Sequence, residues 1–115
     1  SMKPIDAKTL RAWQIDQREF VLVDTLLTAA YNKGHLPGAM HIVSDNILNL
    51  SPSRLPDREQ VIVVYCASIN CKRAGLSAER LESLGYGRVF HFIGGKREWI
   101  AAGFPLESTG RLDAG

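Results

Sequence analysis

Two uninterrupted runs of apolar, mainly β-branched residues restrict the folds open to this chain. Residues 20–24 read FVLVD, and residues 61–65 read VIVVY. Neither run alternates apolar with polar side chains, which is typical of strands buried on both faces, as in parallel sheets. A third and weaker run covers residues 88–92. The pattern therefore predicts an α/β domain with a mainly parallel sheet.

Helical patterns lie between these runs. Residues 5–13 predict a short helix with Asp6 as its cap. An apolar stripe predicts a longer helix from about residue 73, which Gly85 is placed to end. The members of this stripe are Ala74, Ala78, Leu81 and Leu84. The other expected elements are a short helix at 96–102, one or two turns at 46–50, a loop at 51–57 and a loose tail at 108–115.

Length and charge limit the class of protein. At 115 residues we expect a single domain over residues 1–115, with its core at about 5–107. The formal net charge is only +2, which gives no reason to expect nucleic acid or an anionic membrane surface as a partner. The longest apolar run, residues 61–67, is too short to cross a bilayer, and no signal peptide is visible. We therefore expect a cytoplasmic protein and, from its size, a monomer.

The segment after the second run has the residues of a reactive-cysteine loop. Cys66 ends the run, and the longer helix begins at about Arg73. The first N–H groups of a helix lack partners, and with Lys72 and Arg73 they create a positive field at the loop. Such a field favours the thiolate, the nucleophilic form of cysteine, and Arg73 could grip an oxyanion with two parallel hydrogen bonds. The alternative is that Cys66 is a small buried residue closing a strand.

Five blocks in register resemble the rhodanese domains, from about residue 5 to residue 107. They are VLVD at 21–24 with GHLPGA at 34–39, VVYC at 63–66, GY at 85–86, GG at 94–95 with Trp99, and AGFPL at 102–106. The resemblance implies a compact α/β domain around a parallel five-stranded sheet flanked by helices. It also implies a sulfurtransferase of the thiosulfate type, without a cofactor.

The resemblance gives each residue of the loop a role. Cys66 takes a sulfane sulfur from a small donor such as thiosulfate, becomes a persulfide, and passes the sulfur to a small thiol or a protein cysteine. Arg73 matches the basic residue that commonly closes the family's loop. Backbone amides cradle the transferred sulfur, and they belong to Ala67, Ser68, Ile69, Asn70 and Lys72.

The loop departs from the family pattern in two ways. From Cys66 to Arg73 it spans eight residues, longer than is usual in the family's sulfurtransferases and in the related phosphatases and arsenate reductases. Its length therefore leaves open sulfane sulfur or a larger oxyanion as substrate. Cys71 makes the loop a C-x4-C variant, and it could resolve a Cys66 persulfide or sulfenate by closing a disulfide. The alternative is a small residue that packs inward.

Two further residues support the loop in this interpretation. Asp24 follows the first run, but Leu26 stands where many family members have Arg. We expect Asp24 to bind backbone amides or a cation near the loop, or to cap the turn. His35 looks structural from the resemblance, and a role as general base is the less favoured alternative. The histidines and cysteines match no compact metal-binding spacing, so we expect no metal.

Four functions remain open on these residues. The favoured one is sulfur transfer through a Cys66 persulfide. The second is a thiol–disulfide or oxyanion reductase of the arsenate type that uses Cys66 and Cys71. Phosphatase chemistry is disfavoured because the loop holds no general acid, although Asp24 or Asp45 could supply one from elsewhere. The last is a non-catalytic binding module. The presence of both Cys66 and Arg73 argues against it, because an inactive module needs neither residue.

Overall fold

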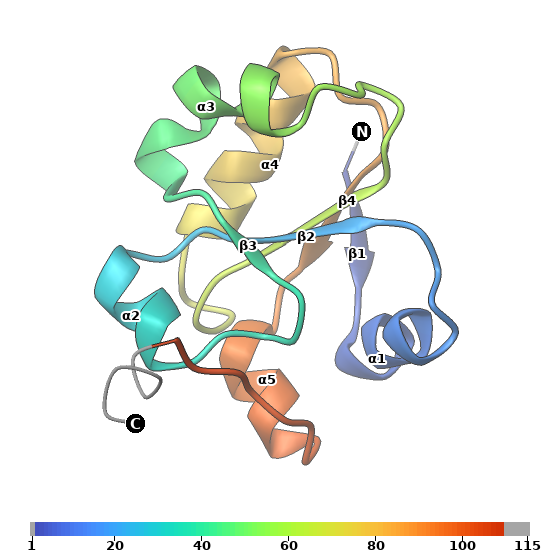
Figure 1. Ribbon diagram of the computed structural model, residues 1–115, viewed down its shortest axis with the longest axis vertical. Helices are drawn as coiled ribbons and strands as arrows, with labels where there is room; N and C mark the ends of the chain where they lie inside the picture. The colour runs from blue at the N-terminus through green and yellow to red at the C-terminus, as the bar shows by residue number, and fades with distance from the viewer. Residues whose placement is uncertain (1, 110–115) are drawn as a thin grey trace.

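Five parallel strands form one sheet in the order β1–β5–β4–β2–β3 (Figure 1). The protein is represented by a computed structural model that describes residues 2–109. The strands are β1 (Lys3–Ile5), β2 (Val21–Asp24), β3 (Met40–His41), β4 (Ile62–Tyr65) and β5 (Val89–Phe92). Every neighbouring pair is parallel, as the three apolar runs predict.

Helices cover both faces of this sheet (Figure 1). They are α1 (Ala7–Ile15), α2 (Thr28–Lys33), α3 (Ile47–Arg54), α4 (Arg73–Ser83) and α5 (Gly95–Ala101), with a short 3-10 helix η1 (Ser44–Asn46) before α3. Helices α3 and α4 pack on one face with Val23, Ile62 and Val64 of the sheet. Helices α1 and α5 pack on the other face with Val63 and Phe92. The compact α/β architecture expected from the sequence is therefore confirmed.

The central strand explains why its sequence shows no alternation. All four residues of β4 are buried, because β2 and β5 flank the strand and helices cover both of its faces. Its neighbour β5 alternates instead: His91 is half-buried on the face toward α4, while Phe90 and Phe92 join the opposite cluster. The sequence expectation that His91 faces away from those two aromatic residues is confirmed.

Two local expectations are wrong. The helix expected over residues 5–13 covers Ala7–Ile15 instead, because Ile5 belongs to β1 and Asp6 caps the helix. The Ser and Pro content of residues 51–57 predicts a loop, but residues 51–54 form the last turn of α3, with Pro52 inside the helix. Tertiary packing outweighs local propensity here. Ser51 and Leu55 are both buried, and the Leu55 N–H donates to the Ser51 carbonyl at 2.7 Å.

The two ends of the described chain are held by specific contacts. Asp6 caps α1, because its side chain accepts a hydrogen bond from the Thr9 N–H at 2.9 Å. Ser108 and Thr109 both donate to the carbonyl of Asn32. The rest of the expected loose tail, 110–115, lies outside the described residues. No helix within 2–109 is long and apolar enough to cross a membrane.

Candidate active site

The loop of residues 66–72 joins the carboxyl end of β4 to α4. Ligands of parallel sheets bind beyond such strand ends, where neighbouring strands deliver their following residues to the same edge. Here β2 lies beside β4, and Asp24 at the end of β2 stands opposite Tyr65 at the end of β4. The loop therefore starts at the centre of the sheet, next to a buried carboxylate.

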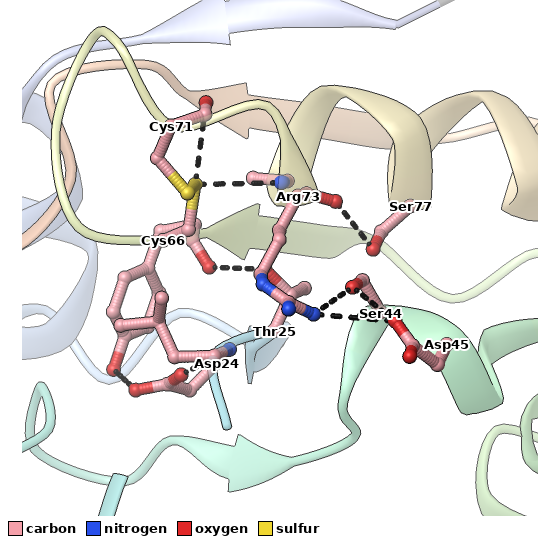
Figure 2. Close-up of a disulfide and its surroundings, with 11 residues drawn as sticks. Asp24, Thr25, Ser44, Asp45, Cys66, Cys71, Arg73 and Ser77 are labelled. Atoms are coloured by element: carbon pink, nitrogen blue, oxygen red, sulfur yellow. Dashed lines mark hydrogen bonds and ion pairs between the residues drawn. A yellow bond between two sulfur atoms is a disulfide. The ribbon is translucent and has the colours of Figure 1, made fainter. Parts of the chain in front are cut away.

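The sulfur of Cys66 lies at the start of α4. The residue is only 2% exposed, and its Sγ accepts a hydrogen bond from the Ala74 N–H at 3.4 Å (Figure 2). This N–H belongs to the first turn of α4, where backbone donors have no partner within the helix. Hydrogen-bond donation from a helix N-terminus favours negative charge on the sulfur.

Cys66 and Cys71 are joined by a disulfide (Figure 2). Their Cα atoms are 6.3 Å apart, a separation that a bridge can span. The loop reaches this separation through a turn in which the Cys71 N–H donates to the Ser68 carbonyl at 3.0 Å. Cys71 is half-buried, whereas Ile69 at the tip of the turn is largely exposed. The loop thus brings the two thiols together in this structure.

The other loop residues form the outer wall of this turn. Ala67, Asn70 and Lys72 are exposed, and Ser68 is half-buried. Within residues 2–109, no group of three or more His, Cys, Asp or Glu residues is placed to hold a metal ion.

The N-terminus of α5 fixes the first part of the loop from the other side. The Lys96 N–H donates to the Cys66 carbonyl at 3.0 Å, and the Arg97 N–H donates to the Ala67 carbonyl at 2.9 Å. This approach depends on Gly95, which has φ +60° and on which a Cβ would collide with the Cys66 carbonyl oxygen. The sequence expectation that this Gly-Gly pair permits a turn that a Cβ would block is confirmed at Gly95.

The Arg73 guanidinium is held by η1 (Figure 2). Its Nη1 donates to the Ser44 hydroxyl at 2.7 Å and to a carboxylate oxygen of Asp45 at 3.2 Å. The sequence places Arg73 at the loop, but it carries no signal that Ser44 is its partner, since the two are far apart along the chain. Asp45, considered above only as a remote acid, is paired with this guanidinium.

Asp24 anchors the end of β4. Its two carboxylate oxygens accept from the Tyr65 hydroxyl at 2.6 Å and from the Leu26 N–H at 2.9 Å. The Leu36 N–H in turn donates to the Tyr65 hydroxyl at 3.0 Å. Burial, and then the nearby Asp24, raise the pKa of Tyr65, so the hydroxyl remains protonated and acts as a donor. Sequence reasoning missed Tyr65 as a supporting residue because its position reads only as part of an apolar strand.

His35 makes contacts outside the loop. One ring nitrogen lies 2.8 Å from the Tyr31 carbonyl oxygen, and the other lies 3.8 Å from a carboxylate oxygen of Glu107. The ring is buried and stacks on Tyr31 with 3.9 Å between centroids. His41 also stacks on Tyr31, at 4.5 Å. The contacts of His35 join α2 to the segment that follows α5, which is what we expect of a structural residue.

Comparisons with known proteins agree with this geometry. The model of the family described as "Rhodanese-like domain" matches residues 6–102. Thiosulfate sulfurtransferase GlpE of Haemophilus influenzae is 28% identical over 103 residues, which cover 86% of this chain and 90% of that protein.

Solved structures give the same result. A rhodanese-like domain from Anabaena is 27% identical with a TM-score of 0.84, covering 94% of this chain and 80% of that one. A thiosulfate sulfurtransferase from Pseudomonas aeruginosa is 26% identical with a TM-score of 0.84, covering 93% of this chain and 20% of that one. Because the family model covers most of the sequence, the chain belongs to the rhodanese-like domain family.

Proposed function

We propose that this protein is a sulfurtransferase that moves a sulfane sulfur through a persulfide on Cys66. The observation that carries the proposal is the Cys66 sulfur at the end of the central strand, with the Ala74 N–H directed at it. With thiosulfate as donor, the Cys66 thiolate attacks the outer sulfur and the sulfur–sulfur bond of thiosulfate breaks. Sulfite leaves with the bonding electron pair, and Cys66 keeps the transferred sulfur.

The loop would stabilise the charges in this step. The backbone amides of residues 67–70 and 72 are the proposed donors to the transferred sulfur. Arg73 contributes positive charge at the start of α4 while Ser44 and Asp45 hold its guanidinium. Asp24 and His35 take supporting roles, the first by fixing Tyr65 next to Cys66.

Cys71 makes this loop a C-x4-C variant of the family's active-site loop. We propose that its thiolate attacks the Cys66 sulfur of the persulfide, forms the Cys66–Cys71 disulfide, and releases the outer sulfur as hydrosulfide. The bridge between these residues supports this role, because it is the product of that step. When a small thiol or protein cysteine reaches the persulfide first, it takes the sulfur instead.

The same bridge favours a second candidate function. A thiol–disulfide or arsenate-type oxyanion reductase also ends its turnover with the two cysteines joined. Such an enzyme needs both thiols for every turnover, whereas sulfur transfer to an external thiol needs only Cys66. The Cys71→Ser variant therefore distinguishes the two: it keeps sulfur transfer and loses reductase turnover.

The decisive experiment is the intact mass of the reduced protein after thiosulfate, with peptide mapping of both cysteines. We expect Cys66 to gain one sulfur in the Cys71→Ser variant, where no resolving thiol is present. In the wild type we expect the Cys66 persulfide together with a second form that is two hydrogens lighter than the reduced protein and carries the Cys66–Cys71 bridge. A Cys71→Ser protein whose mass is unchanged by thiosulfate, with Cys66 fully reduced, would contradict the proposal.

The reaction also suggests a setting. Because both the nucleophile and the acceptor are thiols, a reducing compartment suits the chemistry, and we propose the cytoplasm. The proposed partners are a small sulfur donor and a thiol or protein-cysteine acceptor, with no role for nucleic acid or a membrane. A monomeric state is proposed from size, and sedimentation of the purified protein tests it.

A further inference from the structure

The two sulfur atoms of the bridge have different surroundings. Cys66 is buried at the end of β4, and its Sγ receives the Ala74 N–H. Cys71 is half-buried on the other side of the loop. Among residues 2–109, the hydrogen bond from α4 goes to the Cys66 sulfur and no N–H group donates to that of Cys71. The disulfide is therefore chemically asymmetric although its two halves are both cysteine.

An open hollow of about 460 Å³ borders Cys71, the half-buried end of the bridge. It lies between the first turns of α4 and strand β5, and its walls are Cys71, Lys72, Gly75, Leu76, Glu79 and His91. Gly75 faces the His91 ring across the hollow, and a Cβ at this position would lie 3.5 Å from that ring. The hollow is open and large enough for a small organic thiol.

The rules of thiol–disulfide exchange give this asymmetry a direction. The incoming thiolate must reach the sulfur that it attacks, and the departing sulfur leaves more readily when its thiolate is stabilised. Cys71 meets the first condition because it lines the hollow. Cys66 meets the second because the Ala74 N–H at the start of α4 donates to its sulfur.

We propose that the hollow beside Cys71 is the entry site for a small thiol reductant, which attacks Cys71 and displaces Cys66. This inference rests on the proposed function, in which the bridge forms during turnover and must be reopened. In the first step the external thiolate forms a bond to Cys71 Sγ, and the electron pair of the bridge leaves with Cys66 as its thiolate. A second external thiol then attacks the mixed disulfide, which releases Cys71 as a free thiol and the reductant as its own disulfide.

The order of attack would regenerate the nucleophile first. As soon as the first thiol binds Cys71, Cys66 is a thiolate with its helix N–H still in place, ready for a new donor. Lys72 supplies a positive charge at the rim of the hollow and Glu79 a negative one. Burial lowers the pKa of His91, so its ring is neutral near pH 7 and adds no further charge. The hollow thus suits a zwitterionic or weakly charged thiol, and glutathione is a suitable probe.

The test begins with the full chain oxidised to the Cys66–Cys71 bridge and no sulfur donor present. Glutathione is added, the reaction is quenched with acid at short times, free thiols are alkylated under acidic conditions, and peptides are mapped by mass. We expect glutathione on Cys71 and the alkyl group on Cys66 at the earliest times. Early glutathione on Cys66, with Cys71 alkylated, would overturn the proposal.

A second variant tests the hollow itself. Leu76→Trp places a larger side chain at a half-exposed position on its wall, and we expect reduction by glutathione to slow by about tenfold because access to Cys71 is reduced. The matched control is Ile15→Trp, an exposed position at the end of α1 on the opposite face of the sheet, which should reduce at the wild-type rate. Equal rates in Leu76→Trp and wild type, with both folded by circular dichroism, would refute entry through the hollow.

These results are independent of sulfur transfer. The exchange assay contains no sulfur donor, so its outcome does not depend on whether Cys66 can form a persulfide. Conversely, the thiosulfate experiment on reduced Cys71→Ser contains no bridge. A failure of the proposed function and a failure of the entry site are therefore seen in different experiments.

Discussion

Replacement of Gly95 by alanine isolates the contact that holds the Cys66 loop against α5. The backbone at Gly95 has φ +60°, and a Cβ there would meet the Cys66 carbonyl and the backbone of Ala67. A left-handed conformation costs a residue with a side chain about 1–2 kcal/mol. Relief of the collision requires the backbone to move, which adds about 1–3 kcal/mol and weakens the two hydrogen bonds from Lys96 and Arg97. We expect Gly95→Ala to lower the free energy of unfolding by about 3 kcal/mol or more.

Two other glycines provide matched controls for the two parts of this cost. Gly103 has φ +82°, but a Cβ added there would point into open space, so Gly103→Ala should show only the conformational part, about 1 kcal/mol. Gly87 has neither a positive φ nor a neighbour within 4 Å, so Gly87→Ala should change stability by less than about 0.5 kcal/mol. Urea denaturation of the reduced proteins measures all three. A Gly95→Ala protein no less stable than Gly103→Ala would refute the reasoning that the loop and α5 are in obligatory close contact.

Three further predictions concern the residues around the loop. Tyr65→Phe leaves a buried oxygen of Asp24 without its donor and should lower the free energy of unfolding by about 1–3 kcal/mol in urea titrations, while a change below the measurement error would argue against this network. Asp45→Asn removes a surface ion pair with Arg73 and should lower the free energy of unfolding by less than about 1 kcal/mol. The same change frees the guanidinium and should therefore lower the KM for thiosulfate, whereas an unchanged KM would show that Arg73 does not bind the donor. Burial lowers the pKa of His91 below its ordinary value of 6.5, so the unfolded chain binds the proton first as pH falls. The contribution of neutral His91 to the free energy of unfolding is therefore complete above pH 6.5 and is lost as the pH falls below it. Urea titrations at about pH 5 and about pH 7.5 should show a smaller loss of stability at the lower pH in His91→Gln than in the wild type. An equal loss in both proteins would contradict this assignment.

Strong periodic or continuous patterns made much of the fold predictable. The runs ending at Asp24 and Tyr65 are strands β2 and β4, and the apolar stripe on α4 begins and ends where the sequence indicates. The short elements were not predictable, because their stability comes from neighbours distant in sequence. Strand β3 has two residues, and α2 contains no buried residue that could mark a stripe.

The candidate site divides in a similar way. Cys66, Cys71 and Arg73 stand in one short segment, so a local pattern was sufficient to find them. The groups that set their surroundings come from elsewhere: Ser44 from η1 and Lys96 from α5. Backbone donors such as the Lys96 N–H leave no trace in residue type, because any amino acid except proline can supply an N–H.

The hydrogen bonds from α5 to the loop also have a consequence for the order in which the protein is made. Synthesis proceeds from the N-terminus, so Cys66 leaves the ribosome well before residues 95–97. Until those residues arrive, the carbonyls of Cys66 and Ala67 lack the donors that fix the loop in the finished molecule. The pairing of strand β1 is also delayed until β5 has been synthesised, because β5 is its partner in the sheet. A nascent chain therefore carries the Cys66 thiol on an incomplete support until helix α5 has been synthesised and has docked on the loop.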